Sequence, residues 1–170
     1  YYRLDQYQLA LDYFLDVLNW SEKKNNEVFV PETLQYIAII FADENRDPSL
    51  NFREFLEKHK SGKYASDMAV AYGDIMLDNS KYIEAASAYE LATALDPLRE
   101  DGPEIQEKVI ASFISAGRDA SKLVAQKNMV ERFGIGSPWY KKYYYRYGLR
   151  RKAEQISRDS IFDLAVFHHQ

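Results

Sequence analysis

Few side chains in this sequence are arranged for catalysis or metal binding. The 170 residues include three histidines and no cysteine, which excludes disulfides, thiolate nucleophiles and cysteine-ligated zinc. His59 stands alone, and the adjacent His168 and His169 would point in different directions on a helix. The stretch GIGSPW, residues 134–139, lacks the lysine of a phosphate-binding loop. We therefore expect a noncatalytic protein with no catalytic residue, no metal site and no cofactor.

The densest concentration of cations and aromatic rings is WYKKYYYRYGLRRK, residues 139–152. It contains no acidic residue, whereas the whole chain has a net charge of −4. Such a segment can stack on sugars or bases and neutralise phosphates, or it can hold an acidic protein partner, with nucleic acid the least favoured ligand. Alternatively, its rings pack the end of the fold and its cations face solvent. The candidate residues are Trp139, Tyr140, Lys141, Lys142, Tyr143, Arg146, Arg150 and Arg151.

The elements that position these residues are predicted to be helices. Apolar residues recur at helical spacing along most of the chain, and only EVFVP, residues 27–31, alternates like a short strand, which we interpret as a linker. The longest apolar run, residues 36–42, is far shorter than the roughly 20 residues of a membrane span, so none is expected. Helices are predicted over 3–19, 32–43, 48–60, 65–78, 81–95, 104–116, 119–133 and 149–168.

Repetition within these helices is the most informative pattern. Two consecutive helices carry the apolar stripes Ala69, Tyr72, Gly73, Met76 and Tyr82, Ala85, Tyr89, Ala92. The first stripe recurs 35 residues earlier at Leu34, Ile37, Ala38 and Phe41. A glycine inside a helix costs about 1 kcal/mol relative to alanine. Because small residues recur at Ala38, Gly73 and Ala111, we expect Gly73 to face a small residue on the paired helix.

Residues 64–97 resemble a tetratricopeptide repeat. The resemblance covers 34 residues and is carried by Tyr72, Gly73, Met76, Ala85, Tyr89, Ala92 and the closing Pro97. It implies an all-α fold, namely an α–α superhelix of antiparallel helix hairpins, with the last helix as a cap. The implied units are 1–20 as the second half of a truncated repeat, 32–63 and 103–135 as degenerate repeats, 64–97 as the strong repeat, and 139–170 as the basic aromatic segment and capping helix.

The resemblance also implies a function in binding. In the family, the first helix of each repeat lines a concave groove that receives a peptide, which makes the chain a protein-interaction or scaffold module. Val70 and Asp74 stand where a well-known subgroup has the lysine and asparagine that grip a C-terminal carboxylate, so that ligand is disfavoured. Three carboxylates around two aliphatic side chains favour a basic, apolar peptide instead. The expected groove residues are Asp67, Val70, Asp74, Leu77 and Asp78.

Two other functions are compatible with the sequence. The basic aromatic segment could make the chain a domain that binds a polyanion or polysaccharide, or the array could be a structural spacer. MVERFGIGSPWY, residues 129–140, resembles bacterial envelope-associated members of the family, which favours a periplasmic or envelope location over the cytoplasm. Because residues 1–20 resemble half a repeat, we expect a piece of a larger protein. The identity of the partner and the oligomeric state are left open.

Overall fold

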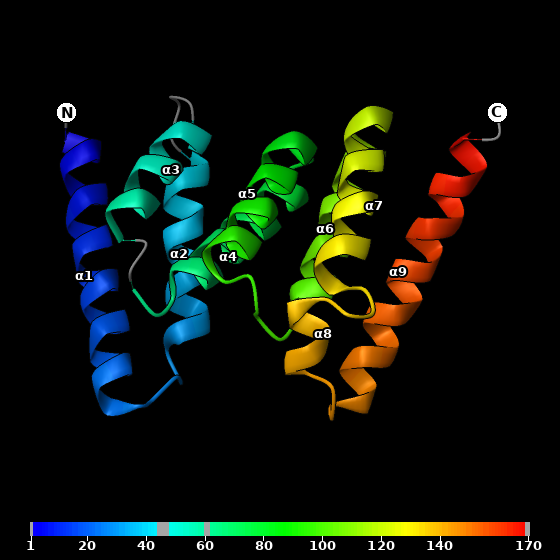
Figure 1. Ribbon diagram of the computed structural model, residues 1–170. Helices are drawn as coiled ribbons and strands as arrows, with labels where there is room; N and C mark the ends of the chain where they lie inside the picture. Colours follow the sequence, from blue (N-terminus) through cyan, green and yellow to red (C-terminus); the bar gives the residue numbers. More distant parts are fainter. Residues whose placement is uncertain (1, 44–47, 60–61, 169–170) are drawn as a thin grey trace.

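The computed structural model describes residues 2–43, 48–59 and 62–168. No strand occurs in these ranges, so the predicted all-α class is confirmed. None of the described helices is both long and apolar enough to cross a bilayer. The helices are α1 (Tyr2–Lys24), α2 (Val30–Asp43), α3 (Pro48–His59), α4 (Ala65–Asp78), α5 (Tyr82–Leu95), α6 (Gly102–Ser115), α7 (Asp119–Phe133), α8 (Pro138–Lys142) and α9 (Tyr147–His168) (Figure 1).

Most helix boundaries agree with the sequence prediction, and α4 and α7 have the predicted bounds. α1 is longer than expected, and α2 begins at Val30, inside the predicted linker. The short helix α8 fills part of the segment that had no predicted structure. It starts there because the Ser137 side chain accepts a hydrogen bond from the Tyr140 backbone amide at 3.1 Å and Pro138 takes the first helical position.

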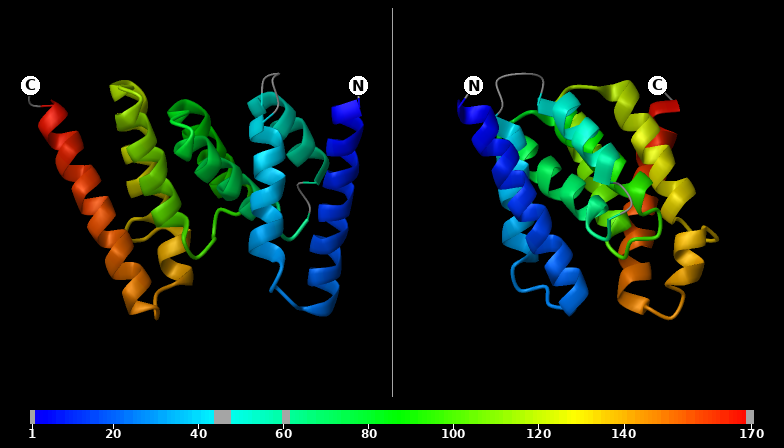
Figure 2. Two further views of the ribbon diagram at one scale, coloured as in Figure 1. Left: turned by 180° about the vertical axis from the view of Figure 1, so that it is seen from behind. Right: turned by 90° about the vertical axis from the view of Figure 1, so that its left-hand side faces the viewer.

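The helices stand in a row that begins with α1 and ends with α9 (Figures 1 and 2). α2 contacts α1, α3 and α4, and from α4 onward each long helix packs on the next, through α5, α6 and α7 to α9. α1 runs from the top of Figure 1 to the bottom, whereas α9 runs from the bottom to the top. Because α1 and α9 stand at the two ends of the row, each has one face that no other helix of the row covers.

Three tight turns reverse the chain between consecutive long helices. Each contains one residue in the left-handed region, namely Asn25 (φ 50°), Ser80 (φ 59°) and Gly117 (φ 64°). The backbone amide just beyond this residue reaches back to a carbonyl near the helix end, as Lys81 does to Met76 at 2.8 Å. The turns leave little connecting chain, and α1–α2, α4–α5 and α6–α7 are consequently antiparallel neighbours.

The core between α4 and α5 explains the helical glycine in a different way from the prediction. Gly73 does not face a small residue, because the ring of Tyr89 lies directly over it. A Cβ atom at position 73 would come within 2.6 Å of Tyr89 Cε1, and Tyr89 is fully buried. A similar contact occurs at the first residue of α6. A Cβ atom on Gly102 would come within 2.6 Å of the ring of Phe133.

The third hairpin, α6–α7, also departs from the expected register. Ala111, predicted to occupy the position equivalent to Gly73, is exposed. Ile110 is buried instead, together with Met129 and Phe133 of α7. The buried face of α6 therefore lies one residue earlier than the sequence repeat indicated.

Candidate functional site

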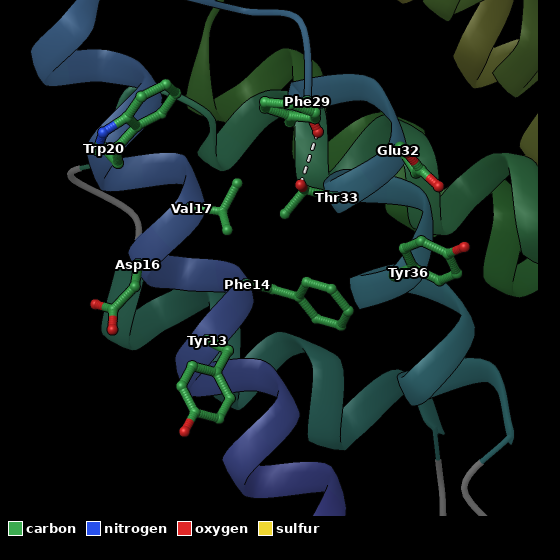
Figure 3. Close-up of a pocket in the computed structure, with 9 residues that line it drawn as sticks. All are labelled: Tyr13, Phe14, Asp16, Val17, Trp20, Phe29, Glu32, Thr33 and Tyr36. Carbon is green, nitrogen blue, oxygen red and sulfur yellow. Dashed lines mark hydrogen bonds between the residues drawn. The ribbon is translucent and has the colours of Figure 1, made fainter.

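An open apolar cleft lies between α1 and α2, and Figure 3 shows its lining. Its volume is about 790 Å³. α1 supplies Tyr13, Phe14, Asp16, Val17 and Trp20. The start of α2 and the residue before it supply Phe29, Glu32, Thr33 and Tyr36. Five of these nine side chains are aromatic, which makes the cleft a surface for burying apolar groups and rings.

Helical periodicity places these side chains on facing flanks of the two helices. Residues 13, 16, 17 and 20 of α1 follow one another at spacings of three, one and three, and residues 29, 32, 33 and 36 follow the same pattern at α2. The turn through Asn25 joins the flanks at one end. The Thr33 hydroxyl donates to the Phe29 carbonyl at 2.7 Å, which fixes the first turn of α2 beside the cleft (Figure 3).

Two of the aromatic rings that line the cleft stack on each other, and Tyr36 of this pair is itself 46% exposed. The rings of Phe14 and Tyr36 stack with their centroids 5.6 Å apart and their planes 8° from parallel. Beyond this pair, Tyr13, Trp20 and Phe29 remain 63%, 44% and 52% exposed. Large aromatic side chains gain stability when they are buried, so this part of the surface is suited to a partner that covers them.

The charged side chains that line the cleft are acidic. Asp16 and Glu32 are exposed and line it, Asp12 is exposed one turn earlier on α1, and no lysine or arginine is among the lining residues. Their carboxylates would attract cations on a bound partner. The lining therefore combines aromatic surface with negative charge.

Comparisons with known proteins do not assign this cleft a function. No protein-family model matches the chain, and no significant match is found among curated proteins or solved structures. What the cleft binds is accordingly inferred from its side chains.

The predicted groove residues on α4 lie in a network of internal contacts. Asp74 accepts hydrogen bonds from the Tyr89 hydroxyl and the Lys108 ammonium group, both at 2.6 Å. Asp67 lies 3.2 Å from the guanidinium group of Arg99. Val70 and Leu77 are half-buried against the core, and Asp78 is exposed. Two of the three predicted groove carboxylates thus already have cationic partners within the chain, which weakens their attraction for a basic ligand.

Tyr89 connects this network to the core. Its ring packs over Gly73, while its hydroxyl donates to Asp74. Burial and the hydrogen bond to the Asp74 carboxylate raise the pKa of Tyr89 well above its ordinary value, because both disfavour the phenolate. Lys108 lies over the same ring, 5.3 Å from its centroid.

The basic aromatic segment is largely engaged in holding α8 against the rest of the fold. Trp139 is buried and donates through Nε1 to the Arg99 carbonyl at 2.7 Å. The Tyr143 hydroxyl and the Lys142 ammonium group both donate to the Leu98 carbonyl, at 2.8 and 2.9 Å. These contacts agree with the alternative in which the rings pack the end of the fold.

Three of the five other cations of this segment also have partners, and one of them, Lys152, lies 3.0 Å from Glu104. Arg146 pairs with Glu100 at 3.0 Å, and the Arg150 guanidinium group lies over the rings of Tyr140 and Tyr144 at 5.6 and 4.9 Å. The Tyr140 hydroxyl donates to Glu154. Lys141 and Arg151 are exposed. The segment therefore offers a polyanion fewer free cations than its composition indicated.

The remaining candidates for chemistry are dispersed. His59 packs against Phe55, with ring centroids 4.7 Å apart, and His169 lies outside the described residues. Within the described ranges, no group of three or more histidines and carboxylates is close enough to hold a metal ion.

Sequence reasoning missed the α1–α2 cleft, although a signal for it was present. Tyr13 and Trp20 are seven residues apart on one flank of α1, outside the stripe that packs on α2. Two large aromatic side chains at that spacing indicate a second apolar face. Phe29 was hidden from this pattern because it lies in the predicted linker.

Proposed function

We propose that this chain is a noncatalytic interaction module that binds an amphipathic helix carrying apolar and cationic side chains in the cleft between α1 and α2. The observation that carries the proposal is the pairing of exposed Tyr13, Trp20 and Phe29 with the carboxylates of Asp16 and Glu32 in a lining that has no cation. A helix with one apolar stripe, flanked by lysines or arginines, matches both properties.

The size of the cleft supports a helix as the occupant. Ligand sites typically enclose about 300–1,000 Å³, and a volume of about 790 Å³ accepts several side chains from one helix face. Burying one leucine or phenylalanine side chain contributes about 1.5–3 kcal/mol. Two or three such anchors, with cations placed near Asp16 and Glu32, offset the entropic cost of association.

In this proposal the row of helices is a scaffold that supports the cleft. We infer that hairpins α2–α3, α4–α5 and α6–α7 form an array of the tetratricopeptide type, with α9 as its last helix. Three features support this arrangement: the stripes of α2 and α4 repeat at 35 residues, α2 packs directly on α4, and the hairpins α4–α5 and α6–α7 share one type of turn. Such an array holds α2 in place through its packing on α4, and α1 packs on α2, so the cleft between α1 and α2 is preformed.

Calorimetric titration with synthetic peptides tests the proposed function. The probe is an 18-residue helix with leucine and phenylalanine on one face and lysine on its borders, and the control peptide carries glutamate in place of each lysine. We expect saturable binding of the cationic peptide, weakened by added salt, and much weaker binding of the acidic one. Equal affinity for both peptides would contradict the assigned role of the rim carboxylates.

A pair of double variants locates the binding. Asp16→Lys with Glu32→Lys should reduce the affinity for the cationic peptide at least tenfold. Glu107→Lys with Glu131→Lys makes the same change of charge at exposed positions of α6 and α7 and should leave the affinity nearly unchanged. If both double variants reduce the affinity equally, the attraction comes from overall charge and the cleft is not the site.

A further inference from the structure

One side of α9 borders two neighbouring cavities. The side is formed by residues that follow one another at spacings of four, three, four and three, namely Tyr147, Arg151, Glu154, Arg158 and Ile161. The first cavity has a volume of about 310 Å³ and lies beside the start of the helix. The second has a volume of about 390 Å³ and lies further along it. Glu154 and Arg158 line both cavities, so the two adjoin each other.

The first cavity is cationic. Three arginines line it, namely Arg150, Arg151 and Arg158, and Glu154 is the one carboxylate among its lining residues. The guanidinium group of Arg150 is held over two tyrosine rings, 4.9 and 5.6 Å from their centroids. Arg151 and Arg158 are exposed, and neither has a hydrogen bond or an ion pair within the described part of the chain. Two guanidinium groups are therefore available to an anion here.

The carboxylates of α9 do not cancel this charge. Glu154 already accepts a hydrogen bond from a tyrosine hydroxyl. Asp159 lines neither cavity and accepts a hydrogen bond from the Gln155 amide at 3.0 Å. Asp163 also lines neither, and it accepts a hydrogen bond from Gln126 of α7 at 2.7 Å. With three arginines and one glutamate, the lining of the first cavity has an excess of two positive charges.

The second cavity is mainly apolar. Val130 near the end of α7, Ile135 in the turn that follows, and Ile161 of α9 line it, and Figure 1 shows this turn beside α9. The Gly134 amide donates to the Val130 carbonyl at 3.0 Å, which fixes the turn. Ile135 and Ile161 are 80% and 52% exposed, so a ligand would cover apolar surface. Ser157 also lines this cavity, and its buried hydroxyl has no hydrogen-bond partner among the described residues.

We propose that the adjoining cavities bind an aliphatic phosphate monoester, with its alkyl chain in the second cavity and its phosphate between Arg151 and Arg158. Charge complementarity decides the head group. A phosphate monoester has about two negative charges at neutral pH, which match the excess of positive charge, whereas a carboxylate has one. The planar guanidinium group also binds pairs of phosphate oxygens. Arg158 borders both cavities and lies where the phosphate joins the chain.

Calorimetric titration of the 170-residue chain tests the pairing of phosphate and alkyl chain. The probe is hexyl phosphate, and each control lacks one property: inorganic phosphate has no chain, hexanol has no charge, and hexanoate has one negative charge. We expect hexyl phosphate to bind at least tenfold more tightly than each control. Butyl phosphate should bind about 15-fold more weakly than hexyl phosphate, because it buries two fewer methylene groups. Equal affinities for hexyl phosphate and inorganic phosphate would overturn the proposal.

Matched variants locate the site. Arg158→Gln should weaken the binding of hexyl phosphate at least tenfold, and Ile161→Ser should weaken it several-fold. Arg118→Gln and Ile114→Ser make the same changes at exposed positions that line neither cavity, and they should leave the affinity nearly unchanged. All four side chains are exposed, and circular dichroism checks that each variant is folded. If Arg158→Gln and Arg118→Gln weaken binding equally, the attraction comes from overall charge and the assigned site is wrong.

A membrane could present the same head group, and vesicles distinguish that source. Vesicles that contain phosphatidic acid carry phosphate monoesters whose chains stay in the bilayer. Binding of hexyl phosphate without cosedimentation of the protein with these vesicles supports the proposal. Cosedimentation without binding of hexyl phosphate overturns it. Either result is independent of the proposed function, because the cleft between α1 and α2 is lined by carboxylates that would repel a phosphate.

Discussion

The ring of Tyr89 lies over the backbone of Gly73, so close that a methyl group at position 73 would come within 2.6 Å of Tyr89 Cε1. The absence of a side chain at position 73 thus makes room for the ring of Tyr89. Since Tyr89 is fully buried, its ring has little room to move away from an added side chain.

Gly73→Ala should therefore destabilise the protein. Alanine favours a helix by about 1 kcal/mol over glycine, but the overpacking against Tyr89 should outweigh this gain and lower the free energy of unfolding by about 1–3 kcal/mol. Gly148→Ala on α9 is the matched control, since a Cβ there would meet nothing within 4 Å. Urea unfolding measures both variants, and a stabilised Gly73→Ala protein would refute the packing that we describe.

Tyr89 should also make the protein sensitive to alkaline pH. Its pKa is raised in the folded state, whereas in the unfolded chain it titrates near 10. Above that value the unfolded chain loses a proton that the folded protein keeps, so the free energy of unfolding falls as the pH rises. In Tyr89→Phe this component is absent, and the decline in stability between about pH 9 and 11 should be shallower. Parallel declines in both proteins would show that Tyr89 ionises normally when folded.

Arg99 should be the most costly cation to remove. Its side chain is 9% exposed, and its guanidinium group lies 2.9 Å from Asp101 and 3.2 Å from Asp67. Arg99→Ala leaves both carboxylates without their partner, and we expect a loss of about 3 kcal/mol in thermal or urea unfolding. Arg118→Ala, at an exposed arginine, should change stability by less than about 0.5 kcal/mol. Equal losses of stability in the two variants would mean that the contacts of Arg99 do not stabilise the fold.

The basic aromatic segment should bind polyanions only weakly. Four of its side chains already contact the connection between α5 and α6, at Leu98, Arg99 and Glu100. They are those of Trp139, Lys142, Tyr143 and Arg146. We therefore expect binding to a single-stranded oligonucleotide or a sulfated polysaccharide to disappear at physiological salt. Tight binding at that salt concentration, abolished by Lys141→Glu with Arg151→Glu, would favour the polymer-binding function instead.

Much of the fold could be predicted because its information is local. The stripe of Tyr72, Gly73 and Met76 and the stripe of Ala85, Tyr89 and Ala92 each lie within a few turns of one helix, and both are buried as expected. The register of α6 was wrong because Ile110 and Ala111 are both acceptable on an apolar face. Only contact with the neighbouring helices decides which of them is buried.

The sites were harder to predict because their partners are distant in sequence. Asp74 meets Lys108, which is 34 residues away, and Asp67 meets Arg99, which is 32 residues away. No helical periodicity connects residues at that separation, so these carboxylates looked free. The cleft was missed for a similar reason, because it exists only where the flank of α1 meets Phe29 and Tyr36 across a turn.

The central claim is that the cleft between α1 and α2 is a binding surface, and the fluorescence of Trp20 tests it most directly. The chain has two tryptophans, of which Trp139 is buried and Trp20 is 44% exposed at the cleft. Titration of the Trp139→Phe protein with the cationic amphipathic peptide should shift the Trp20 emission to shorter wavelength and saturate, and the acidic control peptide should cause no shift. An unchanged Trp20 emission at peptide concentrations that calorimetry shows to be saturating would contradict the account, because the peptide would then be bound elsewhere.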